Sequence, residues 1–94
     1  MSLAALWKYV TSYTDGRVRL RHPGLMREDV CALIQQRFSG IDGVSEVETN
    51  PRTGSMLVTY DPEKFTTDDL IAHGTKWGAW LDALHSGLNL PAPE

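Results

Sequence analysis

The sequence contains one cysteine, no long apolar run and no excess of basic residues, and each shortage argues against a class of protein. A single cysteine, Cys31, cannot form an internal disulfide, so nothing points to an oxidising compartment. No run of about 18 apolar residues occurs, so no segment is predicted to span a membrane. A net charge of −3 argues against non-specific nucleic-acid binding as the main role. We therefore predict a cytoplasmic protein without a nucleic-acid partner.

Signatures of catalysis are also missing. The chain has no serine–histidine–acid pattern, and no nucleophile is paired with an evident base. No glycine-rich phosphate-binding motif follows a predicted strand. With 41% apolar and 22% charged residues, the composition is that of a small globular domain. We predict a non-catalytic domain over residues 1–88, followed by a disordered tail at 89–94.

Two strands joined by a tight turn are predicted near the N-terminus. Residues 7–13 are rich in β-branched and aromatic side chains, and residues 17–21 alternate arginines with apolar residues. Asp15-Gly16, between these runs, is a strong signal for a two-residue hairpin turn.

This turn also determines which side chains share a face of the hairpin. A two-residue turn sets Tyr13 opposite Val18 and Thr11 opposite Leu20. The tyrosines then lie on the core side with the apolar residues, and the arginines lie outside. A single long strand with a bulge at Gly16 is the competing interpretation.

Beyond the hairpin, the pattern predicts a helix and a second pair of strands. Apolar residues recur at helical spacing over 25–38, with Met26 among the core positions. Strands are predicted at 44–49 and 55–60, on either side of a turn that contains proline and glycine.

The last predicted element is a long helix. Thr66 and Asp69 have the spacing of a capping box at its start, and an apolar seam continues to Leu88. Gly74 and Gly78 lie within this seam, and each costs about 1 kcal/mol relative to alanine. The pattern therefore leaves open a break between these two glycines.

This order of elements predicts an α+β, ferredoxin-like β-α-β-β-α sandwich with an extra N-terminal strand. It would have a small antiparallel sheet with two helices on one face, and the second helix would be long. The right-handed crossover rule makes the strand at 17–21 parallel to a strand reached after the first helix. The fourth strand usual in this fold is hard to find after the second helix. The N-terminal strand is expected to take its place at the sheet edge.

Two segments of the chain resemble heavy-metal-associated domains. They are residues 43–62, GVSEVETNPRTGSMLVTYDP, and residues 16–23, GRVRLRHP. Such domains carry copper or zinc in metallochaperones and at the N-termini of metal-pumping P-type ATPases. The resemblance covers residues 16–72, is nearest to the cysteine-less branch of the family, and implies the ferredoxin-like fold and a link to metal transport.

The metal ligands of that family are not found at the matching positions. Metal-binding members carry Cys-x-x-Cys in the loop before the first helix, and the resemblance puts these positions at about Arg27 and Val30. Arginine and valine do not ligate copper(I) or zinc, which bind thiolate or imidazole. Cys31 is one residue further on, which on a helix means a rotation of about 100°. The resemblance therefore implies a member without the family's metal site.

One group of side chains is a candidate ligand site. His22, Met26 and Cys31 bracket the Pro23-Gly24 loop, and together they offer donors for copper, zinc or haem. The alternative is a loop histidine, a core methionine and a half-buried cysteine without a ligand. On that alternative no cofactor is expected.

Two further groups are candidates for contact with a protein partner. Arg17, Arg19 and Arg21 form a basic row that suits an acidic surface, although a solvated outer sheet face explains the row equally. Trp80 and Leu84 are expected to be partly exposed on the long helix, and exposed tryptophans mark partner surfaces. A metal transporter or a second copy of the chain, giving a dimer, is the expected partner.

The sequence as a whole favours an interaction or regulatory module associated with metal ion transport or trafficking. The first alternative is a haem or soft-metal binder that uses His22, Met26 and Cys31. The second is an acylphosphatase-like enzyme that uses Arg21 and Arg27. That enzyme shares the ferredoxin-like fold, but fold alone does not establish function.

Overall fold

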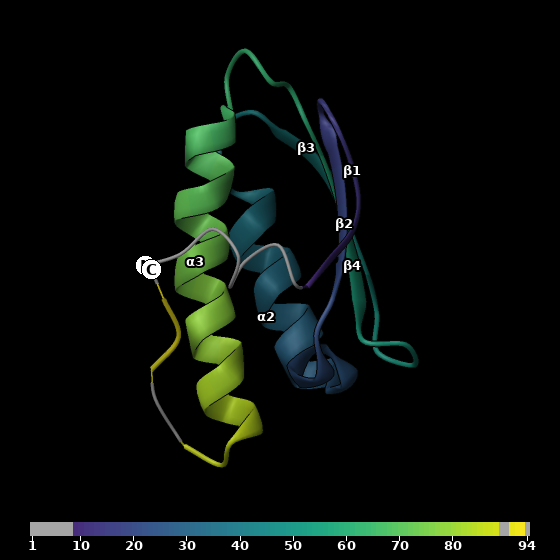
Figure 1. Cartoon of the computed structure of the whole chain (residues 1–94), viewed down its shortest axis with the longest axis vertical. Coiled ribbons are helices and arrows are strands. Elements are labelled where there is room, and N and C mark those ends of the chain that lie inside the picture. Colours follow the sequence, from purple (N-terminus) through teal and green to yellow (C-terminus); the bar gives the residue numbers. More distant parts are fainter. Residues whose placement is uncertain (1–8, 89–90, 94) are drawn as a thin grey trace.

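The structure is a computed structural model, and it describes residues 9–88 and 91–93 of the chain. Two α-helices lie on one side of a four-stranded sheet, and within residues 9–88 and 91–93 no helix lies on its other side (Figure 1). The elements, in chain order, are β1 (Val10–Thr14), β2 (Arg17–Arg21), the 3-10 helix η1 (Pro23–Met26), α2 (Glu28–Ser39), β3 (Val44–Asn50), β4 (Ser55–Tyr60) and α3 (Thr67–His85).

The sheet has the strand order β1-β2-β4-β3, and every neighbouring pair is antiparallel. Since β4 lies between β2 and β3 and is antiparallel to both, β2 and β3 are parallel to each other. They are joined through α2, which is the split β-α-β arrangement expected from the crossover rule. β1 occupies the edge beside β2, where the absent fourth strand would lie. The predicted α+β fold, with its extra N-terminal strand, is confirmed.

The N-terminal hairpin has the predicted turn but not the whole predicted register. Tyr13 pairs with Val18 as expected, whereas a bulge between Val10 and Ser12 brings Val10 opposite Leu20 in place of Thr11. The bulge turns the apolar Val10 side chain toward the core, against which it packs. Tyr13 lies on the core side of the sheet, as predicted, with its hydroxyl 3.4 Å from that of Thr67, although it is 37% exposed on the edge strand. Residues 7 and 8 of the predicted strand lie outside the described residues.

The first long helix begins three residues later than the sequence pattern predicts. Pro23–Met26 forms the 3-10 turn η1, and Arg27 is extended (φ −95°, ψ 129°), so α2 begins at Glu28. The extended residue changes the direction of the chain, and Met26 therefore leaves the apolar face of the helix. Met26 is 56% exposed, and its prediction as a core residue is wrong.

The long helix α3 is continuous. Thr66 and Asp69 form the predicted capping box at its N-terminus, with each side chain bonded to the other residue's backbone N–H. The helix continues through Gly74 and Gly78 without a break and ends at His85. Leu88 is exposed, so the buried part of the apolar seam ends before it.

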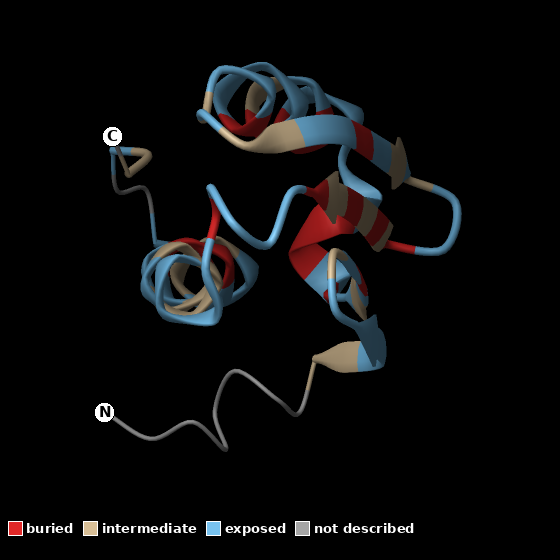
Figure 2. Ribbon diagram, turned by 90° about the horizontal axis from the view of Figure 1, so that it is seen from above, coloured by how far each residue is buried: buried red, intermediate tan, exposed pale blue. Residues whose placement is uncertain are grey.

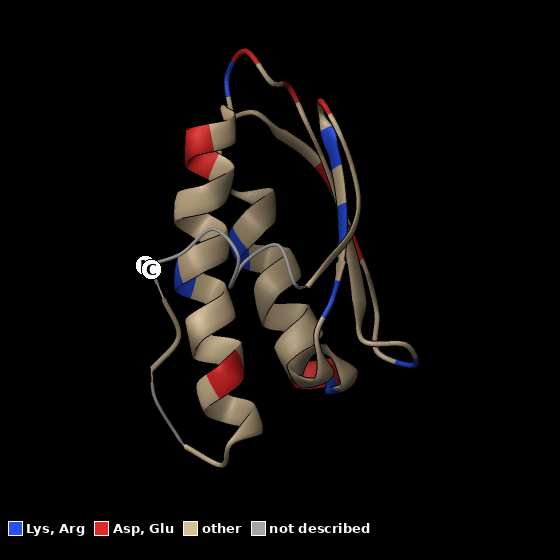
Figure 3. Ribbon diagram, viewed as in Figure 1, with Lys and Arg blue, Asp and Glu red and all other residues tan. Residues whose placement is uncertain are grey.

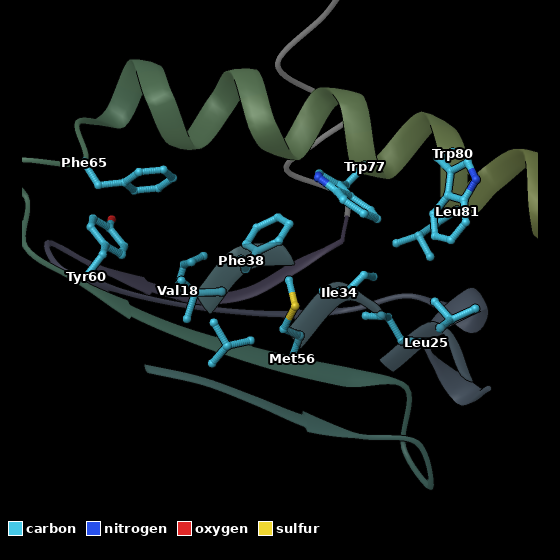
Figure 4. Packing of buried hydrophobic residues seen from close by; sticks show 13 residues of the cluster. Val18, Leu25, Ile34, Phe38, Met56, Tyr60, Phe65, Trp77, Trp80 and Leu81 are labelled. Carbon is cyan, nitrogen blue, oxygen red and sulfur yellow. The ribbon is translucent and has the colours of Figure 1, made fainter. Parts of the chain in front are cut away.

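The core lies between the sheet and the two helices (Figures 2 and 4). Buried residues line the sides of the elements that face one another, and exposed residues line the outer sides. Trp77 of α3 packs edge-on against Phe38 of α2, with ring centroids 5.6 Å apart. Near the start of α3, Phe65 packs against Tyr60 of β4 at 5.4 Å. Burial of this apolar surface is the main force that holds α3 on the sheet.

The chain after α3 returns to the domain. Ala92 packs against the core, and Arg37 of α2 donates a hydrogen bond to the carbonyl of Pro93 at 2.9 Å. Residues 89, 90 and 94 of the predicted tail lie outside the described residues. The boundary at residue 88 remains a prediction. Among the described residues, no helix is both long and apolar enough to cross a membrane.

Candidate functional site

His22 lies at the end of β2, just before η1, and only 3% of its surface is exposed. Its Nδ1 accepts a hydrogen bond from the backbone N–H of Gly24 at 2.9 Å. Because Nδ1 accepts, the neutral ring carries its proton on Nε2. Nε2 then donates to Oδ1 of Asp82 at 2.8 Å. Both nitrogens of the imidazole are therefore engaged within the fold.

Asp82, whose side chain is half exposed, accepts hydrogen bonds from two residues of this cluster. Its Oδ1 also accepts a hydrogen bond from the Tyr9 hydroxyl at 2.6 Å, and the rings of Tyr9 and His22 lie 4.4 Å apart. The cluster joins α3 to the end of β2 and to the residue before β1. Asp82 was not singled out from the sequence, although it is the only charged residue of α3 after Lys76, apart from the terminal His85. A single carboxylate within an apolar helical segment is the sequence signal that indicates Asp82.

Cys31 and Met26 lie on either side of the start of α2, but neither offers a free, buried donor. The Cys31 thiol is buried and donates to the carbonyl of Leu25 at 3.0 Å. Burial raises the pKa of the Cys31 thiol, which disfavours the thiolate that binds metals. Met26 is largely exposed, as described above. The donor atoms of His22 and Cys31 face hydrogen-bond partners within the fold, and neither is directed at a site shared with Met26.

No group of three or more His, Cys, Asp or Glu side chains in the described part of the chain could hold a metal ion. Arg27 and Val30, the two positions that the resemblance predicts to match the family's cysteines, also lack metal ligands. Arg27 is exposed and binds Asp29 at 2.6 Å, and these hydrogen bonds hold the pKa of the Asp29 carboxyl below its usual range. Val30 is buried in the core. The ligand set inferred from His22, Met26 and Cys31 stays a prediction.

The burial of Cys31 predicts slow thiol chemistry. We expect a disulfide reagent such as dithionitrobenzoate to modify native Cys31 at least about 100-fold more slowly than the same residue in denaturant, because the thiol is covered and protonated. The measurement is the rate of thionitrobenzoate release with and without urea. A variant with an exposed cysteine, Ser39→Cys in a Cys31→Ser background, serves as the control for reagent access. Equal rates for native and unfolded protein would contradict the buried position of this thiol.

The space beside His22 is much smaller than a haem group. An apolar cavity of about 50 Å³ lies between α3 and the sheet, with His22, Leu20 and Gly78 among its lining residues. A cavity of about 150 Å³ is needed to hold a molecule as small as benzene. The alternative of a haem site at His22 therefore finds no matching space beside that residue.

The two arginines of the enzyme alternative bind different groups. Arg21 Nε donates to the carbonyl of Thr53 at 3.3 Å, while Arg27 binds Asp29. The nearby Gly24 N–H, a possible anion donor, is directed at His22 instead. These side chains do not form a shared phosphate cradle in the structure.

Of the two residues predicted to be partly exposed on α3, Leu84 is and Trp80 is not. Trp80 is 8% exposed and packs edge-on against Trp77, with ring centroids 5.3 Å apart. Leu84 is half-buried and packs against the same core. The expectation that Trp80 is exposed is wrong, because α3 lies against the core over most of its length and buries this face.

Two polar side chains near the start of α3, the half-buried His73 and the buried Tyr60, pack among aromatic rings. The His73 ring packs beside Phe38 and Phe65, and burial, followed by the charge of Lys76, lowers the pKa of His73. Burial also raises the pKa of Tyr60 to about 12, with a smaller contribution from Tyr13. Both side chains are therefore held neutral near pH 7, as suits groups packed among aromatic rings.

The outer side of the sheet presents a different surface, which we call the charged face. Arg17, Arg19 and Arg21 point outward from β2, as predicted, and all three are exposed. Figure 3 shows basic residues spaced along this strand. Glu46 and Glu48 are exposed on β3 at the far edge of the same face. The strand between them, β4, contributes Thr59, Leu57 and Ser55, none of which is charged.

The charges of this face are not neutralised by one another. Among the described residues, the two ion pairs shorter than 4.0 Å are His22–Asp82 and Arg27–Asp29, and neither lies on the charged face. The Arg21 side chain donates a hydrogen bond to the carbonyl of Thr53 and not to a carboxylate. The face is therefore an exposed, ordered set of charges on a rigid sheet, which suits recognition of a charged partner.

Comparison with known proteins gives one match. The family model described as heavy metal associated domain 2 matches residues 9–78. The match covers the whole sheet, α2 and the first part of α3. No curated protein and no solved structure shows a significant match to the chain.

Proposed function

The chain belongs to the heavy metal associated domain 2 family, and from that premise we propose that it is a non-catalytic interaction or regulatory module in metal ion transport or trafficking. It acts in the cytoplasm and belongs to the cysteine-less branch associated with P-type ATPases. Its one cysteine is buried and hydrogen-bonded, and the resemblance implies that Arg27 and Val30 occupy the positions of the family's cysteines. These features favour a role in contact with the transport machinery over direct transfer of metal.

The charged face is the observation that carries this proposal. The opposite side of the sheet is covered by α2 and α3, so the outer side is the broad, flat surface left for a partner (Figure 1). Arg17, Arg19 and Arg21 supply positive charge in one row, and none of them belongs to an ion pair in the described structure. An acidic protein surface is the partner that such a row recognises.

We expect binding to a cytoplasmic domain of a metal-transporting P-type ATPase to depend on this row. In isothermal titration or NMR titration, Arg17→Glu/Arg19→Glu should raise Kd by about tenfold or more, because attraction is replaced by repulsion. Raising the ionic strength should weaken binding of the native chain, since exposed charges are screened. Arg52→Glu is the matched control, because Arg52 is exposed in the β3–β4 turn, off the charged face.

Three outcomes would contradict the proposal. The first is failure of the native chain to bind any such domain. The second is binding that the double reversal leaves unchanged. The third is stoichiometric uptake of copper(I) or zinc that disappears in Cys31→Ser, since this would make the chain a metal carrier despite the buried thiol.

A further inference from the structure

The charges of the charged face are arranged in matched rows across three strands. Each arginine of β2 is aligned, through an uncharged residue of β4, with a polar residue of β3. The three aligned sets are Arg17–Thr59–Glu46, Arg19–Leu57–Glu48 and Arg21–Ser55–Asn50. A basic row and an acidic row therefore run side by side, in register, with a neutral row between them.

The two rows are separated by two strand spacings, or about 10 Å. The described structure contains no ion pair between them, although each acid is in register with an arginine. A surface that carries both signs in parallel rows has its best complement in a surface with the same rows exchanged. A second copy of the same chain can present those rows.

We infer that a second copy of this chain docks on the charged face about a two-fold axis parallel to β4. The inference rests on the proposed function in that it concerns the same charged face, on which the second copy and the transporter domain would compete. Rotation by 180° about this axis carries the basic row of one copy over the acidic row of the other. Arg19 then faces Glu48 of the second copy, and Arg17 faces Glu46. The two-fold symmetry makes each of these contacts twice.

The charge pattern selects this axis over the other in-plane axis. A two-fold axis perpendicular to the strands would set the basic row against itself and the acidic row against itself. The axis along β4 avoids both repulsions and also brings the half-buried Leu57 of each copy together. A small apolar centre with a charged rim is the usual anatomy of an interface. Sheets packed face to face keep their strands within about 30°, which this arrangement allows.

The area of the charged face determines how tightly the two copies are expected to bind. Three strands of five to seven residues form the aligned region. Such a surface is smaller than the roughly 800 Å² per partner of a standard stable interface. The dimer should therefore be transient, and its pairs should be sensitive to salt.

Sedimentation equilibrium at low ionic strength, up to about 1 mM chain, tests the dimer over the range in which a Kd of about 0.1 mM is measured. The native chain should self-associate, and added salt should weaken the association. Arg19→Glu and Glu48→Arg should each raise the dimer Kd by about tenfold or more, because each sets two like-charged pairs face to face. The charge swap Arg19→Glu/Glu48→Arg should restore association. Arg52→Glu, an equal change off the face, should leave the dimer unchanged.

Mixing two variants with opposite charges on the face tests the two-fold arrangement directly. A chain with Arg17→Glu/Arg19→Glu has an acidic face, and a chain with Glu46→Arg/Glu48→Arg has a basic one. Neither should self-associate, whereas an equimolar mixture should form a heterodimer. In a Cys31→Ser background, Thr59→Cys should be joined to its own copy by a short bismaleimide cross-linker, because the axis along β4 sets Thr59 against its own copy across sheets about 10 Å apart, too far for a direct disulfide. A cross-strand axis would instead set Thr59 near Ser55.

A monomeric native chain at all concentrations would overturn this inference, and so would failure of the charge swap or of the mixture to restore association. A different measurement, binding of the transporter domain, tests the proposed function. An acidic transporter domain that binds the basic row should bind Glu48→Arg as tightly as the native chain or more tightly, although that substitution breaks the dimer. If the native chain is monomeric at all concentrations and still binds the transporter domain, the dimer inference is wrong and the proposed function stands.

Discussion

Replacement of Trp77 by alanine should lower the free energy of unfolding by about 4 kcal/mol, the range seen when a large buried aromatic is truncated. Trp77 is buried at the centre of α3, between Phe38 on α2 and Trp80 on its own helix. A single domain of this size has a total stability of about 5–15 kcal/mol. The variant should therefore unfold at a much lower urea concentration, or be partly unfolded without urea.

The measurement is urea unfolding followed by far-UV circular dichroism, which reports the helices without relying on tryptophan emission. Trp77→Phe is the matched control, because it keeps an aromatic ring against Phe38 and leaves a smaller cavity. We expect it to lose about 1–2 kcal/mol. If Trp77→Ala costs no more than Trp77→Phe, then α3 is not held to the sheet through this residue.

Replacement of Gly54 by alanine should cost about 3 kcal/mol, because strain and steric overlap act together. Gly54 has a positive φ of 70°, and its carbonyl accepts the backbone N–H of His22 at 2.8 Å. A Cβ atom on Gly54 would lie 2.7 Å from the carbonyl oxygen of His22. Because the clashing atom belongs to the backbone, β4 and the end of β2 must separate to make room.

Gly87 provides the matched control. It also has a positive φ, 91°, but an added Cβ would meet no atom within 4 Å. Gly87→Ala should therefore show the conformational cost alone, about 1–2 kcal/mol. Thermal or urea unfolding of both variants separates the conformational cost of the positive φ from the cost of the steric overlap with His22. Equal losses would mean that the close approach of Gly54 to His22 adds nothing, contrary to the packing described here.

The loop after β2 engages its candidate donor atoms in hydrogen bonds among the described residues. In this chain the loop is held by its own hydrogen bonds: His22 to Gly24 and Asp82, and Cys31 to Leu25. Donor atoms that are satisfied in this way must lose those bonds before they bind a metal. The same family fold therefore presents its broad charged face as the better candidate for function.

Much of this fold follows from short stretches of sequence. The alternation of Arg17, Val18 and Arg19 set the two faces of β2, because side chains of a strand alternate between its faces. Asp15-Gly16 specified the hairpin turn, and Thr66 with Asp69 specified the start of α3, because both depend on hydrogen bonds between near neighbours in the chain. These features need no knowledge of distant residues.

Other features were decided by tertiary structure alone. The bulge before Ser12, the late start of α2 and the burial of Trp80 all depend on what packs against them. His22 contacts Asp82, which lies 60 residues further along the sequence, and no local sequence pattern predicts a contact over that separation. The matched charge rows likewise appear only when β4 is placed between β2 and β3. By itself, the sequence determined the order of the elements and their inner and outer faces, because those depend on local periodicity. Tertiary packing decided which polar groups are satisfied within the fold and which remain open to a partner, because that depends on elements far apart in the chain.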